Sequence, residues 1–454
     1  MLIRFKVGNF LSFNDIQEFS MLPGNDCSKQ NRLYKDTNIE LLKFTAIFGA
    51  NAAGKSNLVS AMVFAKNMIM KGFPESAIWK YCKLDDANRE KQSYFEFEIE
   101  LNGRYYAYGF ELVLKQQRVV SEWLYELFSE GESKEIFTRD LEKKECNIGS
   151  YFQDEKLSER LKVYADDISE DASVLFLKNL NQNKDTLYDK FEESKIIQEV
   201  FIWFMWKLDI NFPDQPISDY TYFDSTENID TICSMIKAFG TGITSYEIVE
   251  DQFEKMSSKI PERVRKNVVD KLMKNNASKI EEDIIPAIIL RSRKSFYIVS
   301  IETVNDEEVI KCRTIQFHHD NTGALFDFSE ESDGTCRLLD LLTILLEDRS
   351  GRVYVIDEID RSLHPQLTYK FISEYLKVAA KKQIQLIVTT HESRLLDLDL
   401  LRRDEIWFVD KNTKGESSVY SFDEYNDMFD KKLDQAYLEG RYGAVPIFNE
   451  IFPS

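Results

Sequence analysis

The chain has 454 residues, 43% of them hydrophobic and 30% charged, a composition typical of a globular protein with two or three lobes. Its apolar runs fall far short of the ~20 residues of a membrane-spanning helix, and its N-terminus lacks the apolar core of a secretory signal, so we expect a cytoplasmic protein. The net charge of −20 opposes nucleic-acid binding over most of the surface, and the six scattered cysteines form no CxxC pair, which favours reduced thiols.

The first predicted elements surround a glycine-rich loop. After an opening strand from Leu2 to Val7, "LLKFTAIFG" is predicted to form a short buried strand, and an amphipathic helix is predicted from Lys55 onward. Between them, "FGANAAGKSNL" fits the pattern GxxxxGK[ST], whose backbone amides and helix N-terminus bind phosphate. Lys55 would reach the β and γ phosphates, and Ser56 would ligate Mg²⁺. The candidate cofactor-binding residues of this loop are Gly49, Asn51, Gly54, Lys55, Ser56 and Asn57.

The middle of the chain is predicted to be β-rich and then helical. From Ser93 to about Phe137 the sequence alternates around an Asn102-Gly103 turn, which indicates a hairpin. Residues 171–290 read as a charged helical insert whose apolar segment 200–206 must be buried, and no heptads point to a long coiled-coil arm. A basic stretch from Lys255 to Lys279 is either a solvated helix face, the default interpretation, or a local DNA-binding face.

Two acidic residues follow a strand in the C-terminal half. In "RVYVIDEID" four strand-forming residues end at Asp357 and Glu358, as a buried parallel strand would deliver them. Beside a P-loop, Asp357 would hold the Mg²⁺ shell and Glu358 would polarise the attacking water. "IQLIVTTHES" is predicted to be the next core strand, and it would place His391 near the same phosphate.

A further helix begins with small polar residues. "FSEESDGTCRLLDLL" places Ser332, Asp333 and Gly334 at the start of an amphipathic helix. Such a helix N-terminus can bind an anion. Because the P-loop already supplies one phosphate site, a second would serve the nucleotide of another protomer. The alternative is that Ser332 or Asp333 only caps a core helix.

Together these motifs resemble the ABC-type ATPases, and within them the branch that contains SMC and RecF. They would be Walker A, signature helix, Walker B with D-loop, and switch histidine. The segments "MLIRFKVGNFLSF", "ESDGTCRLLDLL", "DEIDRSLHP", "TTHES" and "AYLEGRYGAVP" further resemble the bacterial AAA-domain ATPases of abortive-infection systems, of the RloA or AbiLi type. No Q-loop is assigned.

The resemblance implies an α/β fold: an ABC-type P-loop NTPase head with an antiparallel β subdomain and an inserted helical lobe. We expect one half of the head at residues 1–170, the helical lobe at 171–290 and the other half at 291–454. Two ATP molecules would be sandwiched in a head-to-tail homodimer, each between the P-loop of one subunit and Ser332 to Gly334 of the other. Glu358 would act as the base and His391 as the γ-phosphate sensor.

The resemblance also implies a biological role. ATPases of this type work with a separately encoded effector, often a Toprim-like nuclease, in defence against phage. A RecF-like DNA-binding ATPase of DNA maintenance or repair is the alternative. The ATPase subunit of a membrane transporter is disfavoured, because long insertions separate Lys55 from Asp357 and no Q-loop is evident.

Overall fold

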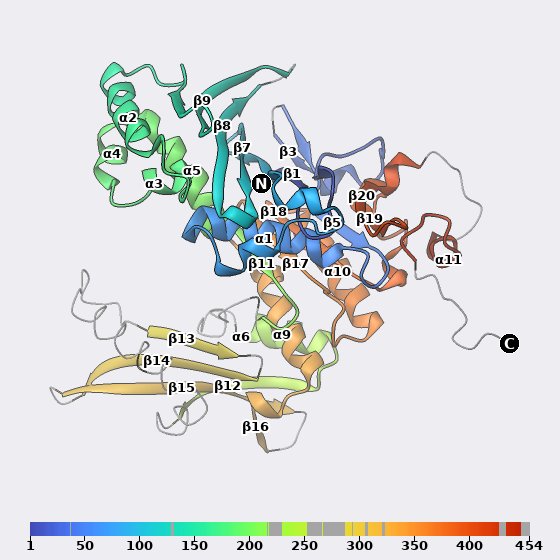
Figure 1. Ribbon diagram of the computed structural model, residues 1–454. Coiled ribbons are helices and arrows are strands. Elements are labelled where there is room, and N and C mark those ends of the chain that lie inside the picture. Colours follow the sequence, from blue (N-terminus) through green and yellow to red (C-terminus); the bar gives the residue numbers. More distant parts are fainter. Residues whose placement is uncertain are drawn as a thin grey trace. The chain divides into compact units, whose positions relative to one another are not determined.

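The computed structural model forms two compact units, each described by itself (Figure 1). The first comprises Met1–Asn211, Asp348–Asp360 and Ile372–Ser454, and the second Phe212–Glu347 and Arg361–Phe371. The structure describes residues 1–36, 38–128, 131–215, 217, 229–251, 266, 287–292, 294–304, 307–319, 323–425 and 433–445.

A mainly parallel sheet forms the core of the first unit. Its order is β11-β17-β18-β5-β19-β20, and only the edge strand β20 runs antiparallel to its neighbour. Strands β5, β17 and β18 are almost continuously apolar and buried, as strands covered on both faces are. The strands are β5 (Phe44–Phe48), β11 (Leu208–Asn211), β17 (Arg352–Ile356), β18 (Ile384–Thr389), β19 (Ile406–Lys411) and β20 (Ser417–Ser421).

An antiparallel sheet completes the first unit, in the order β10-β9-β8-β7-β6-β1-β2. The predicted hairpin is present: Asn102 and Gly103 have positive φ angles and join β6 to β7, with Leu101 opposite Arg104. The Gln385 side chain ties the two sheets together, because it exchanges hydrogen bonds with both backbone groups of Leu2. The strands are β1 (Leu2–Gly8), β2 (Gln17–Ser20), β6 (Ser93–Leu101), β7 (Arg104–Val113), β8 (Arg118–Leu127), β9 (Ser133–Asp140) and β10 (Glu145–Ile148), with a separate pair β3 (Tyr34–Lys35) and β4 (Glu40–Leu41).

The helices of the first unit follow the predicted apolar pattern. In α1 (Lys55–Lys71) the apolar side chains spaced along one helical face, Leu58, Met62, Ala65 and Ile69, are all buried. Helix α10 (Pro365–Ala379) starts in the second unit with a proline at the first helical position, and its residues from Ile372 onward belong to the first unit. The other helices of this unit are α2 (Glu155–Ile168), α3 (Phe176–Leu180), α4 (Asp185–Lys190), α5 (Lys195–Ile202) and α11 (Leu433–Leu438).

The second unit combines a sheet with two complete helices, α6 and α9, and the first part of α10 among its described residues. Strands β12, β15, β14 and β13 pair in that order, all antiparallel, and β16 pairs with β15. Helix α9 begins after Ser332 and buries most of its side chains. The elements are α6 (Ile229–Ala238), β12 (Ile243–Asp251), β13 (Ala287–Ser292), β14 (Ser295–Val304), β15 (Glu307–His319), β16 (Leu325–Asp327) and α9 (Asp333–Leu346).

The expected mixed α/β fold with an antiparallel sheet is confirmed, whereas two local expectations need correction. The insert 171–290 is not purely helical: β11 and β12 lie in it, because each forms backbone hydrogen bonds with a strand far along the chain. The apolar segment 200–206 is only partly buried. Trp203 is fully covered, but Trp206, three residues later in the same π-helical turn, is 63% exposed. The basic stretch from Lys255 to Lys279 lies outside the described residues, except for Lys266.

Candidate nucleotide-binding site

The glycine loop leaves β5 and turns sharply into α1. Gly54 precedes the helix with a φ of 125°, a conformation that side chains rarely adopt. Gly49 is required for space, because a Cβ atom there would lie 2.4 Å from the backbone oxygen of Val409. The backbone therefore needs glycine at both fixed positions of the motif.

A hydroxyl cluster lies behind the loop. The Ser417 hydroxyl donates to the backbone oxygen of Ala53 at 2.5 Å and lies 2.7 Å from the Ser12 hydroxyl. Asn57 donates from Nδ2 to the same Ser12 oxygen at 2.7 Å. The Asn57 side chain, predicted to bind nucleotide, thus holds the loop to the segment after β1. Neither serine was singled out from the sequence, because 405 residues separate them.

Lys55 is buried, with 4% of its surface exposed. Its ammonium donates to the backbone oxygens of Gly49 at 2.6 Å and Ala50 at 3.1 Å. Burial lowers the pKa of this lysine to about 8, against the opposing attraction of Asp357 and neighbouring carboxylates. The lysine is positioned at the loop where a phosphate chain would need a cation.

Asp357 and Glu358 follow β17 in the same unit. Asp357 is buried, and its Oδ1 accepts a 2.6 Å hydrogen bond from the Thr389 hydroxyl. The Glu358 backbone amide donates to that hydroxyl oxygen at 2.8 Å. Glu358 has a φ of 47°, in the left-handed region that non-glycine residues adopt infrequently.

His391 lies two residues beyond the end of β18. Its Nδ1 is 3.4 Å from the Lys55 ammonium, and its backbone amide donates to Asp360 at 3.4 Å. Loss of solvation and the Lys55 charge lower the pKa of the ring, so the imidazole is neutral at pH 7 and can accept a hydrogen bond. Because β18 lies between β5 and β17, all three loops reach the same edge of the sheet.

The donor set fits Mg²⁺. Ser56, at the start of α1, offers a hydroxyl on an exposed residue, and Asp357 offers a buried carboxylate. Among the described residues no group of three or more His, Cys, Asp or Glu side chains could hold a metal alone. Such a sparse oxygen set suits Mg²⁺, which is usually bound through one or two carboxylates together with substrate phosphates.

The predicted signature residues lie in the second unit. Ser332 caps α9, accepting a hydrogen bond from the Thr335 amide at 3.0 Å. Gly334 packs against the segment that follows Asp357 and Glu358: a Cβ atom at Gly334 would lie 2.8 Å from the Ser362 backbone oxygen. Ser332 is therefore the N-cap of α9, and phosphate binding at the same helix end stays a prediction.

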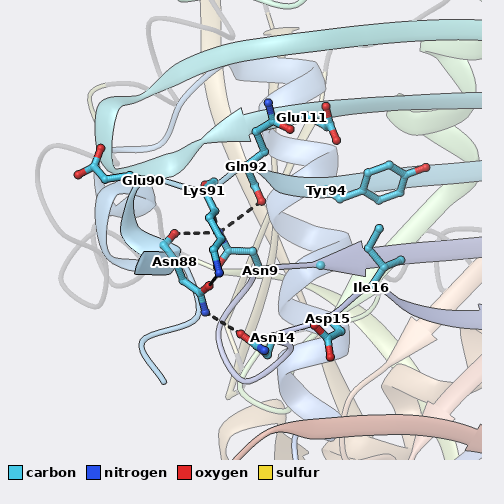
Figure 2. A pocket seen from close by; sticks show the side chains of 11 residues that line it. Asn9, Asn14, Asp15, Ile16, Asn88, Glu90, Lys91, Gln92, Tyr94 and Glu111 are labelled. Carbon is cyan, nitrogen blue, oxygen red and sulfur yellow. Dashed lines mark hydrogen bonds between the residues drawn. The ribbon is translucent and has the colours of Figure 1, made fainter. Parts of the chain in front are cut away.

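A polar cavity of about 510 Å³ lies between the loop after β1 and the start of β6 (Figure 2). Asn9 donates to the backbone oxygens of Asn88 and Lys91, and Asn88 donates to Asn14. These hydrogen bonds join the cavity's own lining, and none of the predicted site residues lines it. The side chains of Asn9 and Asn88 therefore tie the loop after β1 to the segment before β6.

Comparison with known families identifies the chain. The family model described as "AAA domain, putative AbiEii toxin, Type IV TA system" matches residues 44–397, which is more than half of the chain. The chain belongs to this AAA-domain family. The matched range of the AAA-domain family begins at β5 and ends shortly after His391, so it contains every predicted site residue. The chain is accordingly a P-loop NTPase.

The solved structures similar to this AAA-domain protein include heads of SMC proteins. "SMC head domain from Thermotoga maritima" is 13% identical, with a TM-score of 0.37, over 92% of this chain and 98% of that chain. The Smc head bound to the C-terminal winged-helix domain of ScpA is 15% identical, with a TM-score of 0.39, over 92% and 97%. The Smc head with an extended coiled coil, bound to the C-terminal domain of ScpA derived from Pyrococcus furiosus, is 14% identical, with a TM-score of 0.39, over 92% and 96%.

At these TM-scores the likeness carries no argument about function. No curated protein matches the chain. Within the described part of the chain, no helix has the length and apolar character needed to cross a membrane.

Proposed function

We propose that the protein binds ATP with Mg²⁺ and hydrolyses it. The observation that carries this proposal is the meeting of three loops at one edge of the parallel sheet, which bring Lys55, the Asp357–Glu358 pair and His391 into one unit. Lys55 would bind the β and γ phosphates. Ser56 and Asp357 would hold Mg²⁺, which when bound neutralises charge that develops on the phosphate oxygens.

The remaining residues supply the chemistry of hydrolysis. Glu358 accepts a proton from the attacking water, and its fixed backbone aims the carboxylate. Neutral His391 contacts the γ phosphate and is kept near Lys55 by the hydrogen bond from its backbone to Asp360. Asn51 lies exposed on the loop, where it would contact the nucleotide.

The active form in this proposal is a homodimer. Ser332 and Gly334 of one subunit would contact the ATP held by the P-loop of the other. Support comes from the N-terminus of α9, a helix of 14 residues whose partial positive charge favours a phosphate. ATP binding would then close the dimer, and hydrolysis would open it.

The dimer would act as a sensor and regulator of a separately encoded effector in abortive infection. Membership of a family described by the AbiEii toxin supports this role. The effector would be a Toprim-like nuclease, which a gene neighbouring this one should encode. A RecF-like role in DNA repair instead requires DNA binding that weakens steeply with salt and stimulates ATP turnover.

The test of hydrolysis is Glu358→Gln. We expect nucleotide affinity near that of the wild type and turnover reduced by about 100-fold or more, since a general base typically contributes about 10²–10⁴-fold. Glu374→Gln is the matched control: Glu374 is partly exposed on α10 and pairs with Lys377. Undiminished turnover in Glu358→Gln would refute the assignment of the base.

Light scattering tests the dimer. The Glu358→Gln protein should be monomeric without nucleotide and dimeric with saturating ATP, because bound ATP persists. A monomer under saturating ATP would count against the shared site. Salt-dependent DNA binding with DNA-stimulated turnover would favour the RecF alternative over the effector role.

A further inference from the structure

Thr389 ends β18 and is completely buried beside the two acidic residues that follow β17. Its hydroxyl donates to Oδ1 of Asp357 at 2.6 Å and accepts from the Glu358 backbone amide at 2.8 Å. Its backbone oxygen accepts from the Ile359 amide at 3.0 Å. One residue thus contacts three consecutive residues of the neighbouring loop.

The chemistry of a hydroxyl explains why threonine suits this position. A hydroxyl has one proton and two lone pairs, so it can donate to a carboxylate and accept from an amide at the same time. Valine has nearly the same shape and can do neither. The hydrogen bond to Asp357 is short because its acceptor is a carboxylate, the stronger class of such bonds.

The same hydroxyl holds a strained backbone. Glu358 adopts a left-handed φ of 47°, which persists in a non-glycine residue only where the surroundings fix it. The hydrogen bond from its amide to Thr389 is one such constraint. Released from it, the backbone of Glu358 would relax and redirect the carboxylate.

Thr389 also lies close to the other functional loops. The next residue, Thr390, donates from its backbone to Ile47 of β5 at 3.1 Å, just before the glycine loop. His391 follows directly. The end of β18 therefore both carries His391 and fixes Asp357 and Glu358. Because His391 comes only two residues after Thr389, a displacement of the histidine would also displace the acidic pair.

We infer that Thr389 is a positioning residue for ATP hydrolysis, which fixes the carboxylate of Asp357 and the backbone of Glu358 through one hydroxyl. This inference rests on the proposed ATPase function. It assigns Thr389 no contact with ATP, so the residue acts on turnover and on the contribution of the metal and has little effect on nucleotide binding without metal.

The experiment compares Thr389→Val with Thr389→Ser. Valine should lower kcat by about 10- to 100-fold, the usual effect of removing a group that orients a metal ligand, and should raise KM for ATP in the presence of Mg²⁺ by up to about tenfold. Serine keeps the hydroxyl and should retain kcat within about threefold of the wild type. The matched control is Thr45→Val, a buried threonine on the adjacent strand β5 whose hydroxyl donates to its neighbour Phe44.

A second measurement does not depend on turnover. The affinity for a fluorescent ATP analogue is measured with Mg²⁺ and with EDTA. Mg²⁺ should raise the affinity of Thr389→Val for the analogue by a factor about tenfold smaller than it does for the wild type. The affinity of the variant in EDTA should stay near that of the wild type. Thr389→Ser and Thr45→Val should behave as the wild type does in both buffers.

The outcomes separate the inference from the function on which it rests. A wild-type protein without turnover overturns the proposed function. A wild-type protein that hydrolyses ATP while Thr389→Val keeps full kcat overturns the inference, as does equal loss in the serine and valine variants. If Thr389→Val does not fold, Thr389→Ala against Thr389→Ser decides in the same way.

Discussion

Replacing Lys55 with methionine should abolish ATP binding and at the same time stabilise the empty protein. Lys55 is held with 4% of its surface exposed, and burial lowers its pKa from 10.5 to about 8. At pH 7 the charged ammonium therefore costs folding free energy. Methionine fills a similar volume without a charge.

The size of the gain follows from the pKa. A lowering from 10.5 to about 8 corresponds to about 3 kcal/mol, at about 1.4 kcal/mol for each pKa unit. The variant also loses the hydrogen bonds to Gly49 and Ala50, each with a net value of about 1 kcal/mol. We expect a net rise of about 1 kcal/mol in the free energy of unfolding at pH 7.

The pH dependence gives the sharper test. Because the folded pKa of Lys55 lies below the unfolded value, the cost is complete below pH 8 and disappears as pH rises toward 10.5. The wild type should therefore gain about 2 kcal/mol relative to Lys55→Met between pH 7 and pH 10. Groups that do not interact with Lys55 titrate alike in both proteins and cancel in the difference.

Tryptophan fluorescence during urea unfolding measures this difference. All five tryptophans lie in the first unit, which also holds the P-loop, so the signal reports on the right part of the chain. Lys377→Met, at an exposed position on α10, should change the free energy of unfolding by less than about 0.5 kcal/mol.

Two results together would refute the reasoning. Lys55→Met would be less stable than the wild type at pH 7, and the difference in the free energy of unfolding between the two proteins would stay the same at pH 10. An ATP analogue should raise the urea midpoint of the wild type and leave that of Lys55→Met unchanged, because only a protein that binds the ligand is stabilised by it.

Three further changes have defined outcomes. ATP turnover should decline only as the pH falls below 6.5, because the pKa of His391 is lowered and its neutral ring accepts from Lys55; His391→Asn should lose this acid limb in a pH–rate profile. Gly334→Ala places a Cβ atom 2.8 Å from the Ser362 oxygen, so light scattering should show loss of the ATP-dependent dimer while fluorescent ATP still binds. Gly49→Ala forces a Cβ atom to within 2.4 Å of a backbone oxygen and should cost about 1–3 kcal/mol in the urea assay.

The parts of the site that could be predicted are those encoded by short segments. The P-loop and the acidic pair each lie within nine residues or fewer between strong strand and helix signals, so local chemistry identifies them. The role of Thr389 could not be predicted this way. Its partners are 31 and 32 residues away, and the contact depends on the register of β18 against β17.

The fold shows the same division. The hairpin at Asn102 and the helix from Lys55 follow from turn chemistry and apolar periodicity. Strand β11 has only four residues, "LDIN", too few for a periodic signal, and it becomes a strand through pairing with β17. The three-part division at 170 and 290 stays a prediction. In the structure the chain passes from the first compact unit to the second at Phe212 and again at Arg361. Because each unit is built from separate segments of the chain, its boundaries leave no signal in the linear sequence.

The order of the parallel sheet has a consequence for synthesis. Strand β5 pairs on both sides with strands that begin at Ile384 and Ile406, more than 330 residues later. At ~5–20 residues per second, the ribosome would need roughly 17 to 70 seconds to supply those partners. Throughout that interval β5 and the helix behind the P-loop present apolar surface without their final neighbours, so the nascent chain depends on its antiparallel sheet or on a chaperone to keep that surface covered.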